Sequence, residues 1–209
     1  MTATPLAFDG SGLDGGLYTE VTRAARDAPW LLNDTASAWS ALGLTAFAAL
    51  MTAAWWRARR ADAPVMARAL AVPLIVALAY GVNVALKELV REDRPCRSLP
   101  GRFTLEACPP PGDWSFPSNH AAVAFAAAAA LWVVDRVLAA GAVPAAVMMA
   151  ASRVWVGAHY PHDVAAGALL GVVLAAPLTV SAARGAPWVA RARKGPLRGL
   201  LLSSVRPSV

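Results

Sequence analysis

The sequence predicts an all-α integral membrane protein: a helical bundle of about five transmembrane helices plus an N-terminal amphipathic helix. Of the 209 residues, 57% are hydrophobic and 15% are charged, and the mean hydropathy is +0.48. This composition is too apolar and too poor in charge for an ordinary soluble domain. The alternative is that these runs are buried helices of a soluble protein. The number of apolar runs in so short a chain disfavours this alternative. The runs are 36–56, 69–86, 121–134, 137–151 and 164–183.

The first segment, residues 1–35, differs from the runs in composition. Leu17, Val21, Ala24, Ala25 and Ala28 recur at helical spacing, which predicts a short amphipathic helix on the membrane surface. A positively charged start followed by a short apolar core is missing, so we expect no cleaved signal peptide.

The central segment, residues 36–183, is expected to form the transmembrane domain. At about 1.5 Å per residue the longer runs cover a hydrocarbon core of roughly 30 Å, and the third and fourth runs need their flanking residues to reach it. The runs are rich in alanine, and small residues let helices approach closely in lipid. The basic tail, 184–209, contains several Gly and Pro residues and is expected to lack regular structure.

The distribution of lysine and arginine predicts the orientation in the membrane. The positive-inside rule places the more basic side in the cytoplasm. The net charge of +6 is then a topology signal with some attraction to anionic lipid, so we expect no nucleic-acid partner. The residues on the basic side are Arg57, Arg59, Arg60, Arg68, Arg136, Arg184, Arg191, Arg193, Lys194, Arg198 and Arg206.

Polar side chains suited to phosphate chemistry occur at the ends of the apolar runs. Because consecutive spans alternate in direction, all of them are expected on the other, outer membrane face. They are Lys87 and Arg94 after the second run, Ser118, Asn119 and His120 before the third, Arg153 after the fourth, and His159 and Asp163 before the fifth.

The basic members of this set suit the binding of a phosphate group. Phosphoryl transfer requires negative oxygens to be held and neutralised. Lys87, Arg94 and Arg153 can do this, the arginines through paired donors that match phosphate geometry. Ser118 and the amides at the start of the third span add neutral donors at the positive end of a helix. We call these four residues the anion socket.

His159 and Asp163 are four residues apart, so a helix that begins near Tyr160 places them on one face. The carboxylate can then accept the proton of one ring nitrogen of His159. This fixes the tautomer and leaves the other nitrogen free to attack phosphorus.

Three motifs, "K-x6-RP", "PS-x-H" and "SR-x5-H-x3-D", follow one another in this order between Lys87 and Asp163. With them the chain resembles the type 2 phosphatidic acid phosphatase superfamily of membrane lipid phosphatases. The resemblance implies that His159 is the nucleophile of a phosphohistidine intermediate and that Asp163 orients it. It also implies that His120 protonates the leaving lipid oxygen and later activates water. The middle of the second motif is commonly Gly and is Asn119 here, which predicts a modest effect on the phosphate-facing turn.

The resemblance further implies a metal-independent hydrolase that needs no cofactor. Its expected partners are the lipid bilayer and a membrane lipid phosphate, with a polyprenyl phosphate or diphosphate preferred over phosphatidic acid or phosphatidylglycerol phosphate. The expected location is the bacterial inner membrane, with the active site on the extracytoplasmic side; the sequence leaves the oligomeric state open. A non-catalytic lipid-phosphate binder or flippase is the alternative. A vanadate-dependent haloperoxidase would share the phosphate site, but those proteins are soluble.

The remaining histidine and the two cysteines have separate interpretations. His162 has no position in the motifs, so we interpret it as an interfacial bystander. Cys96 and Cys108 lie in the loop expected outside, which predicts a disulfide; two free thiols are the alternative. A metal site formed by His120, His159 and Asp163 is disfavoured because the surrounding basic residues would repel a cation.

Overall fold

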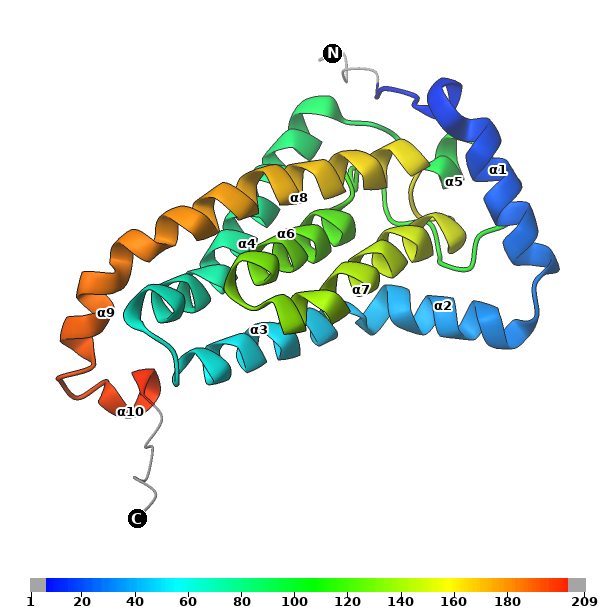
Figure 1. The fold of residues 1–209 in the computed structure, drawn as a ribbon. Helices are drawn as coiled ribbons and strands as arrows, with labels where there is room; N and C mark the ends of the chain where they lie inside the picture. Colours follow the sequence, from blue (N-terminus) through cyan, green and yellow to red (C-terminus); the bar gives the residue numbers. More distant parts are fainter. Residues whose placement is uncertain (1–6, 203–209) are drawn as a thin grey trace.

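The computed structural model describes residues 7–202, which contain helices and no β-strand. Figure 1 shows an elongated bundle with α1 and α5 at one end and α9 and α10 at the other. The all-α fold class predicted from the sequence is confirmed. The helices are α1 (Ser11–Asp27), α2 (Trp30–Leu42), α3 (Leu44–Ala58), α4 (Ala63–Val90), α5 (Pro95–Ser98), α6 (Asn119–Val134), α7 (Arg136–Trp155), α8 (Pro161–Ala182), the 3-10 helix η1 (Ala183–Gly185), α9 (Ala186–Ala192) and α10 (Arg198–Leu201).

Each of the five predicted apolar runs lies on helix, but not every run is a full span. Three described helices are long and apolar enough to cross a bilayer: α4, α7 and the continuous segment Pro161–Ala192 that begins with α8. The pair α2 and α3 passes the same test together, although the two helices are bent by 53°. Helix α6 is apolar but has only 16 residues. Length and composition therefore support three spans, or four with the bent pair.

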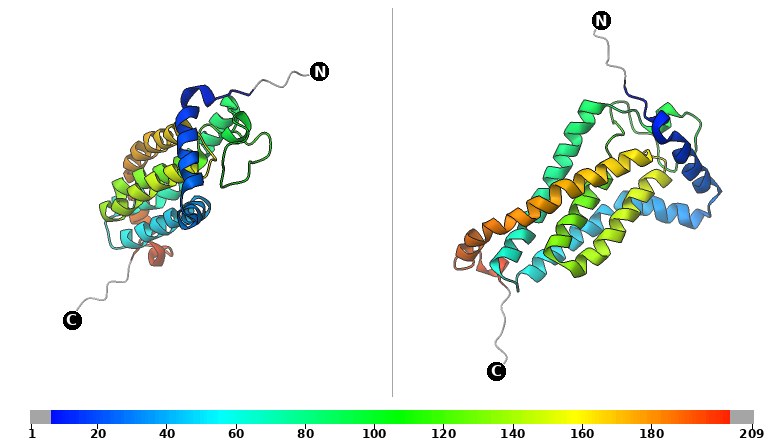
Figure 2. Two further views of the ribbon diagram at one scale, coloured as in Figure 1. Left: turned by 90° about the vertical axis from the view of Figure 1, so that its right-hand side faces the viewer. Right: turned by 45° about the horizontal axis from the view of Figure 1, so that its top comes forward.

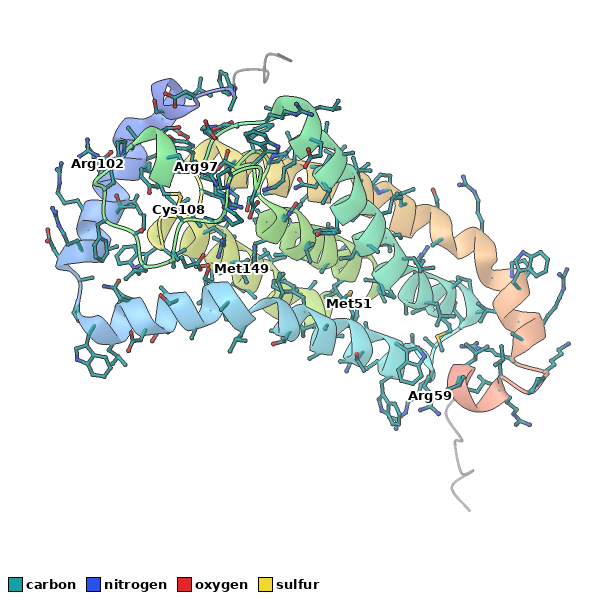
Figure 3. The ribbon with its side chains drawn as sticks, turned by 180° about the vertical axis from the view of Figure 1, so that it is seen from behind. Met51, Arg59, Arg97, Arg102, Cys108 and Met149 are labelled. Carbon is teal, nitrogen blue, oxygen red and sulfur yellow. A yellow bond between two sulfur atoms is a disulfide. The ribbon has the colours of Figure 1, made fainter. Side chains whose placement is uncertain are left out.

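The bend between α2 and α3 lies at Gly43, where a side chain of α7 enters the junction. A Cβ atom at Gly43 would lie 2.5 Å from the Trp39 carbonyl oxygen and 2.7 Å from Cε of Met149, which is labelled in Figure 3. A residue without a side chain is therefore needed at this junction for Met149 to remain in place.

Helix α6 lies in the middle of the bundle and packs against α8, α7, α4 and α3. Its buried positions are mostly alanine, and α8 faces it with Gly167 and Gly171. A Cβ atom at Gly171 would lie 2.5 Å from the carbonyl oxygen of Ala122 and 2.8 Å from the amide nitrogen of Ala126. Small residues on both helices thus bring the start of α6 close to the start of α8.

Helix α1 lies across one end of the bundle (Figure 2) and packs against α5, α7 and α8. The Tyr18 hydroxyl donates a hydrogen bond to the carbonyl oxygen of Gly157, 3.1 Å away. Leu17, which was expected on the apolar stripe, is 52% exposed. The face that packs on the bundle consists of Gly15, Tyr18, Thr22 and Ala25. The position of α1 on a membrane surface stays a prediction.

The opposite end of the bundle is closed by residues after Arg184. Val189 of α9 and Leu201 of α10 are buried in one apolar cluster with residues of α3 and α4. Arg193 donates to the carbonyl oxygen of Ala61 at 2.9 Å, and Arg59 donates to that of Gly199 at 2.8 Å. The expectation of an irregular tail is therefore wrong for residues 184–202, because apolar side chains anchor two short helices. Residues 203–209 of that tail lie outside the described residues.

Candidate active site

Lys87 and Arg94 are brought together by the end of α4. The helix ends at Val90, and its C-cap residue Arg91 has a left-handed conformation with φ of 53°. Lys87 Nζ donates to the carbonyl oxygen of Trp114 and lies 3.9 Å from Oδ1 of Asp113. Arg94 donates to the Asp113 carboxylate at 2.8 Å and to the Asp113 carbonyl oxygen at 3.0 Å. Both basic side chains are buried.

Arg153, in the last turn of α7, is also buried and paired. Its Nη1 donates to Oγ of Ser40 in α2 and to Oε1 of Glu106 at 2.9 Å. Ser40 in turn donates to the same Glu106 oxygen at 2.5 Å. Each arginine of the anion socket therefore faces a carboxylate from the segment that links α5 to α6.

The start of α6 carries Ser118, Asn119 and His120. Ser118 is the N-cap of the helix, and its amide donates to the carbonyl oxygen of Asp163 at 3.0 Å. Asn83 of α4 donates to the Asn119 side-chain oxygen at 2.7 Å and to the Pro117 carbonyl oxygen at 3.1 Å.

Asn119 is the first residue of a regular helix rather than a residue with unusual backbone angles. The side chain of Asn119 instead accepts a hydrogen bond from Asn83 of α4, and the modest effect on the phosphate-facing turn stays a prediction. Since its oxygen accepts from Asn83, Asn119 can offer a phosphate only N–H donors. His120 is partly buried one residue later, and no hydrogen bond from another described residue fixes its ring.

His159 and Asp163 form a buried pair at the start of α8. The His159 Nδ1 atom lies 3.1 Å from Oδ2 of Asp163, and the two residues are 1% and 0% exposed. The Asp163 Oδ2 also accepts from the Tyr160 amide at 2.9 Å and from the Ser115 hydroxyl. The other ring nitrogen, Nε2, lies 3.4 Å from Nη1 of Arg94. The pair therefore presents its free nitrogen to the anion socket.

The local sequence explains how the backbone around His159 is fixed in position. Gly157 has φ of 82°, and a Cβ atom there would lie 2.7 Å from Cγ2 of Thr104, so the turn after α7 favours glycine on two grounds. The His159 amide donates to the Arg153 carbonyl oxygen at 3.2 Å. Pro161 then begins α8 and Asp163, as its third residue, accepts from the Tyr160 amide. One carboxylate thus both caps the helix and orients the histidine.

The surroundings of His159 favour the neutral imidazole. Burial lowers the pKa of His159 well below its ordinary value of 6.5, and the positive charges of Arg94, Arg153 and Lys87 lower it further. The imidazole is therefore neutral at neutral pH, as a nucleophile must be. For Asp113 partial burial favours the protonated carboxyl group, but the hydrogen bond and charge of Arg94 outweigh it and hold the pKa below its ordinary value.

The structure also contains polar residues that the motifs do not include. His162 was interpreted as an interfacial bystander, but its ring is engaged in the fold: its nitrogens lie 2.7 Å from Asp14 and 2.9 Å from Glu92. Asp14 is 148 residues away in the sequence, so no local pattern predicts this contact. The other residues missed are Ser40, Asn83, Glu106, Asp113 and Ser115. In the sequence, Glu106 and Asp113 are recognisable only as two of the acidic residues that match the basic residues of the loop before the third apolar run.

Two further predictions concern cysteine and metal ligands. Cys96 and Cys108 are joined by a disulfide, with Cα atoms 5.9 Å apart, at the end of the bundle where Figure 3 labels Cys108. Among the described residues, Glu92, His162 and Asp163 bring potential ligand atoms within 4.8 Å of one another. The separation of His162 and Glu92 is that of a hydrogen bond, so these residues are already paired without a metal.

The fold and this site define the chain as a helical membrane protein with a buried histidine–aspartate pair beside a basic anion socket. The model of the PAP2 superfamily matches residues 68–185. The chain therefore belongs to the PAP2 superfamily, which is the family indicated by its three motifs.

Individual relatives cover less of the chain. An undecaprenyl-diphosphatase of Sulfolobus acidocaldarius is 33% identical over 110 residues, which are 49% of this chain and 48% of that protein. The bacitracin transport permease protein BcrC of Bacillus licheniformis is 41% identical over 63 residues, 30% of this chain and 31% of that protein. The chain thus spans about half or less of these relatives. The crystal structure of Aquifex aeolicus LpxE matches with a TM-score of 0.66 and 23% identity, over 84% of this chain and 99% of that one, which shows a shared fold.

Proposed function

We propose that the protein is a metal-independent lipid phosphatase that acts through a phosphohistidine intermediate on His159. One observation carries this proposal: the Nε2 atom of the buried His159 faces Arg94 of the anion socket while its Nδ1 atom is held by Asp163. A phosphate bound to the socket would have its phosphorus next to a nucleophilic nitrogen.

The reaction then has two steps. In the first, Nε2 of His159 forms a bond to phosphorus, the bond from phosphorus to the lipid oxygen breaks, and His120 gives its proton to that oxygen. In the second, His120 takes a proton from water, the oxygen attacks phosphorus, and the phosphorus–nitrogen bond breaks to release inorganic phosphate. Asp163 holds the Nδ1 proton of His159 throughout, and Lys87, Arg94 and Arg153 stabilise the charge on the phosphoryl oxygens.

The proposed substrate is a lipid whose tail remains in the bilayer while its phosphate reaches the socket. A polyprenyl diphosphate or monophosphate is the first choice, supported by the name of the Sulfolobus relative. Phosphatidic acid and phosphatidylglycerol phosphate are the second choice. A diphosphate offers more negative charge to three basic residues than a monophosphate does, which favours the polyprenyl diphosphate over the lipid monophosphates in the panel.

We place the site on the extracytoplasmic side of a bacterial inner membrane. The bundle end opposite the site carries Arg57, Arg59 and the basic residues of α9 and α10, and basic ends remain in the cytoplasm. The disulfide at the site end supports the same orientation, because disulfides persist in oxidising compartments.

The experiment is phosphate release from a panel of these lipids by purified protein in detergent with EDTA. We expect release by the wild type and none by His159→Ala. The two lysines of the chain supply a matched pair: Lys87→Ala should lose most activity and Lys194→Ala should keep it. Phosphohistidine trapped by rapid acid-free quenching should be present in the wild type and absent in His159→Ala. Unchanged release by His159→Ala would refute the mechanism.

A non-catalytic binder or flippase is the second candidate, and the word permease in the name of the Bacillus relative favours testing it. This function would use Lys87, Arg94 and Arg153 but would not need the paired His159 and Asp163. Tight binding of a lipid phosphate without release of phosphate from any lipid would support it.

A further inference from the structure

His162, which lies outside the three motifs, connects three separate parts of the chain at the second residue of α8. Its Nδ1 lies 2.7 Å from Oδ1 of Asp14 in α1, and its amide donates to the other oxygen of Asp14 at 2.7 Å. Its Nε2 lies 2.9 Å from Oε1 of Glu92, in the segment after α4. The ring also stacks on that of Tyr160, with 5.4 Å between centroids.

Both nitrogens of the ring face carboxylate oxygens. A neutral imidazole has one N–H and can donate to one of them, whereas an imidazolium donates to both. The charged groups next to the ring are all acidic: Asp14 from α1, Glu92 from the segment after α4, and Asp163 from its own helix. Its other neighbours are the aromatic rings of Tyr160 and Phe116. This geometry favours a positively charged His162.

The charge of His162 lies beside the oxygen of Asp163 that His159 does not use. Asp163 is fully buried, and its Oδ1 has no hydrogen-bond partner among the described residues. Nε2 of His162 lies 3.4 Å from this Oδ1. A buried carboxylate needs compensating positive charge to remain ionised, and only the ionised form accepts through all of its lone pairs.

The N-terminal segment holds this arrangement in place. Phe8 forms a bridge to Glu92: its amide donates to the Arg91 carbonyl oxygen at 3.1 Å, and its carbonyl oxygen accepts from the Asp93 amide at 2.9 Å. Gly10 lies so close to the Glu92 carboxylate that a side chain at this position would overlap it. His162 is therefore fixed by groups on all three segments.

We propose that His162 is a positioning residue for the reaction, acting through Asp163 to hold His159 in the tautomer and orientation needed for attack. Asp14 supplies the outer end of this chain of contacts and links α1 to the nucleophile. The proposal rests on the proposed phosphatase function and adds His162, with Asp14 beyond it, behind the His159–Asp163 pair. Because His162 does not contact the anion socket, it affects the chemical step and leaves substrate binding unchanged.

The test compares His162→Gln, Asp14→Asn and Asp9→Asn with the wild type in the phosphate-release assay. Glutamine keeps hydrogen-bonding ability but has no charge, so kcat should fall roughly 10- to 100-fold while KM stays within about twofold. Asp14→Asn should lower kcat less, and the double variant should match His162→Gln alone because the two residues act in series. Asp9→Asn is the control, since the Asp9 side chain is exposed and bonds the Ser11 amide of the same segment; its kcat should not change.

The outcomes separate this proposal from the function on which it rests. No release by the wild type would overturn the proposed function and this proposal with it. Release by the wild type together with an unchanged kcat in His162→Gln would overturn the positioning role alone, as would a change in KM with kcat unaltered. If His162→Gln does not fold, as judged by its thermal melting, Asp14→Asn decides, because it leaves the ring in place: a lower kcat at constant KM supports the proposal and an unchanged kcat overturns it.

Discussion

Asp113 is expected to compete with the substrate for the anion socket, and its replacement by asparagine should lower KM. The carboxylate lies 2.8 Å from Arg94 Nη2 and 3.9 Å from Lys87 Nζ, where an oxygen of a phosphate would bind. The basic side chains are 6% and 7% exposed, but that of Asp113 is 46% exposed. Substrate must therefore displace an anion that can move into water.

The size of the effect follows from this partial exposure. An exposed ion pair contributes about 0.2–1 kcal/mol, and a buried hydrogen bond to a charged group about 1.5–3 kcal/mol. A half-exposed carboxylate with one close and one distant partner should contribute about 1 kcal/mol. Asparagine removes the charge but keeps the backbone carbonyl that accepts from Arg94. A change of about 1 kcal/mol corresponds to a roughly fivefold lower KM, with kcat unchanged because ground state and transition state gain equally.

The assay is phosphate release at varied surface concentration of lipid phosphate in mixed micelles. Inhibition by inorganic phosphate provides a second measurement that involves no chemical step, and its inhibition constant should fall by the same factor. Asp93→Asn is the matched control, because Asp93 pairs with Arg97 at 3.9 Å instead of with the socket. A KM that rises or stays constant in Asp113→Asn would refute the reasoning and would mean that Asp113 holds Arg94 in position for the substrate.

Three further predictions test other parts of the structure. Gly171→Ala should lower the free energy of unfolding by about 1–3 kcal/mol and reduce activity, because the added methyl group would push α8 away from Ala122. Gly141→Ala is the control and should be neutral or stabilising, because nothing lies within 4 Å of the added atom. Equal melting temperatures of the two variants would contradict the α6–α8 packing. Reduction of the Cys96–Cys108 disulfide should lower the free energy of unfolding by about 2–3 kcal/mol, given a sequence separation of 12. It should also speed proteolysis between these two residues. Full alkylation of both cysteines without reductant would contradict the disulfide. Phosphohistidine formation should persist as the pH falls through 6.5, because the pKa of His159 is well below this value and the ring becomes protonated only at lower pH. Single-turnover quench experiments measure the phosphoenzyme. A loss of phosphoenzyme centred near pH 6.5 would contradict the lowered pKa of His159.

The sequence predicts the helices and the motif residues because both depend on local spacing. Lys87, Arg94, Arg153, His159 and Asp163 are all placed at helix ends by their distance from apolar runs, and the structure brings them together. By length and composition the structure supports three or four spans where the sequence predicted about five. Hydropathy does not reveal the bend at Gly43, where Met149 enters the junction, and helix α6 has only 16 residues. The contact of Asp14 with His162 is beyond sequence reasoning, because it depends on how α1 crosses the bundle and no periodicity encodes that geometry.

The acidic partners of the socket follow from a requirement that the motifs alone do not express. Lys87, Arg94 and Arg153 are buried at the end of an apolar bundle, and buried charges need compensation whether or not substrate is bound. Asp113 and Glu106 supply that compensation from one segment. Substrate binding therefore replaces a carboxylate by a phosphate at the socket instead of neutralising unpaired cations. The same carboxylates compete with the product phosphate and thereby favour its release. Tighter product inhibition in Asp113→Asn should therefore accompany the lower KM, and the pair of changes would identify the carboxylate as a competitor for the socket.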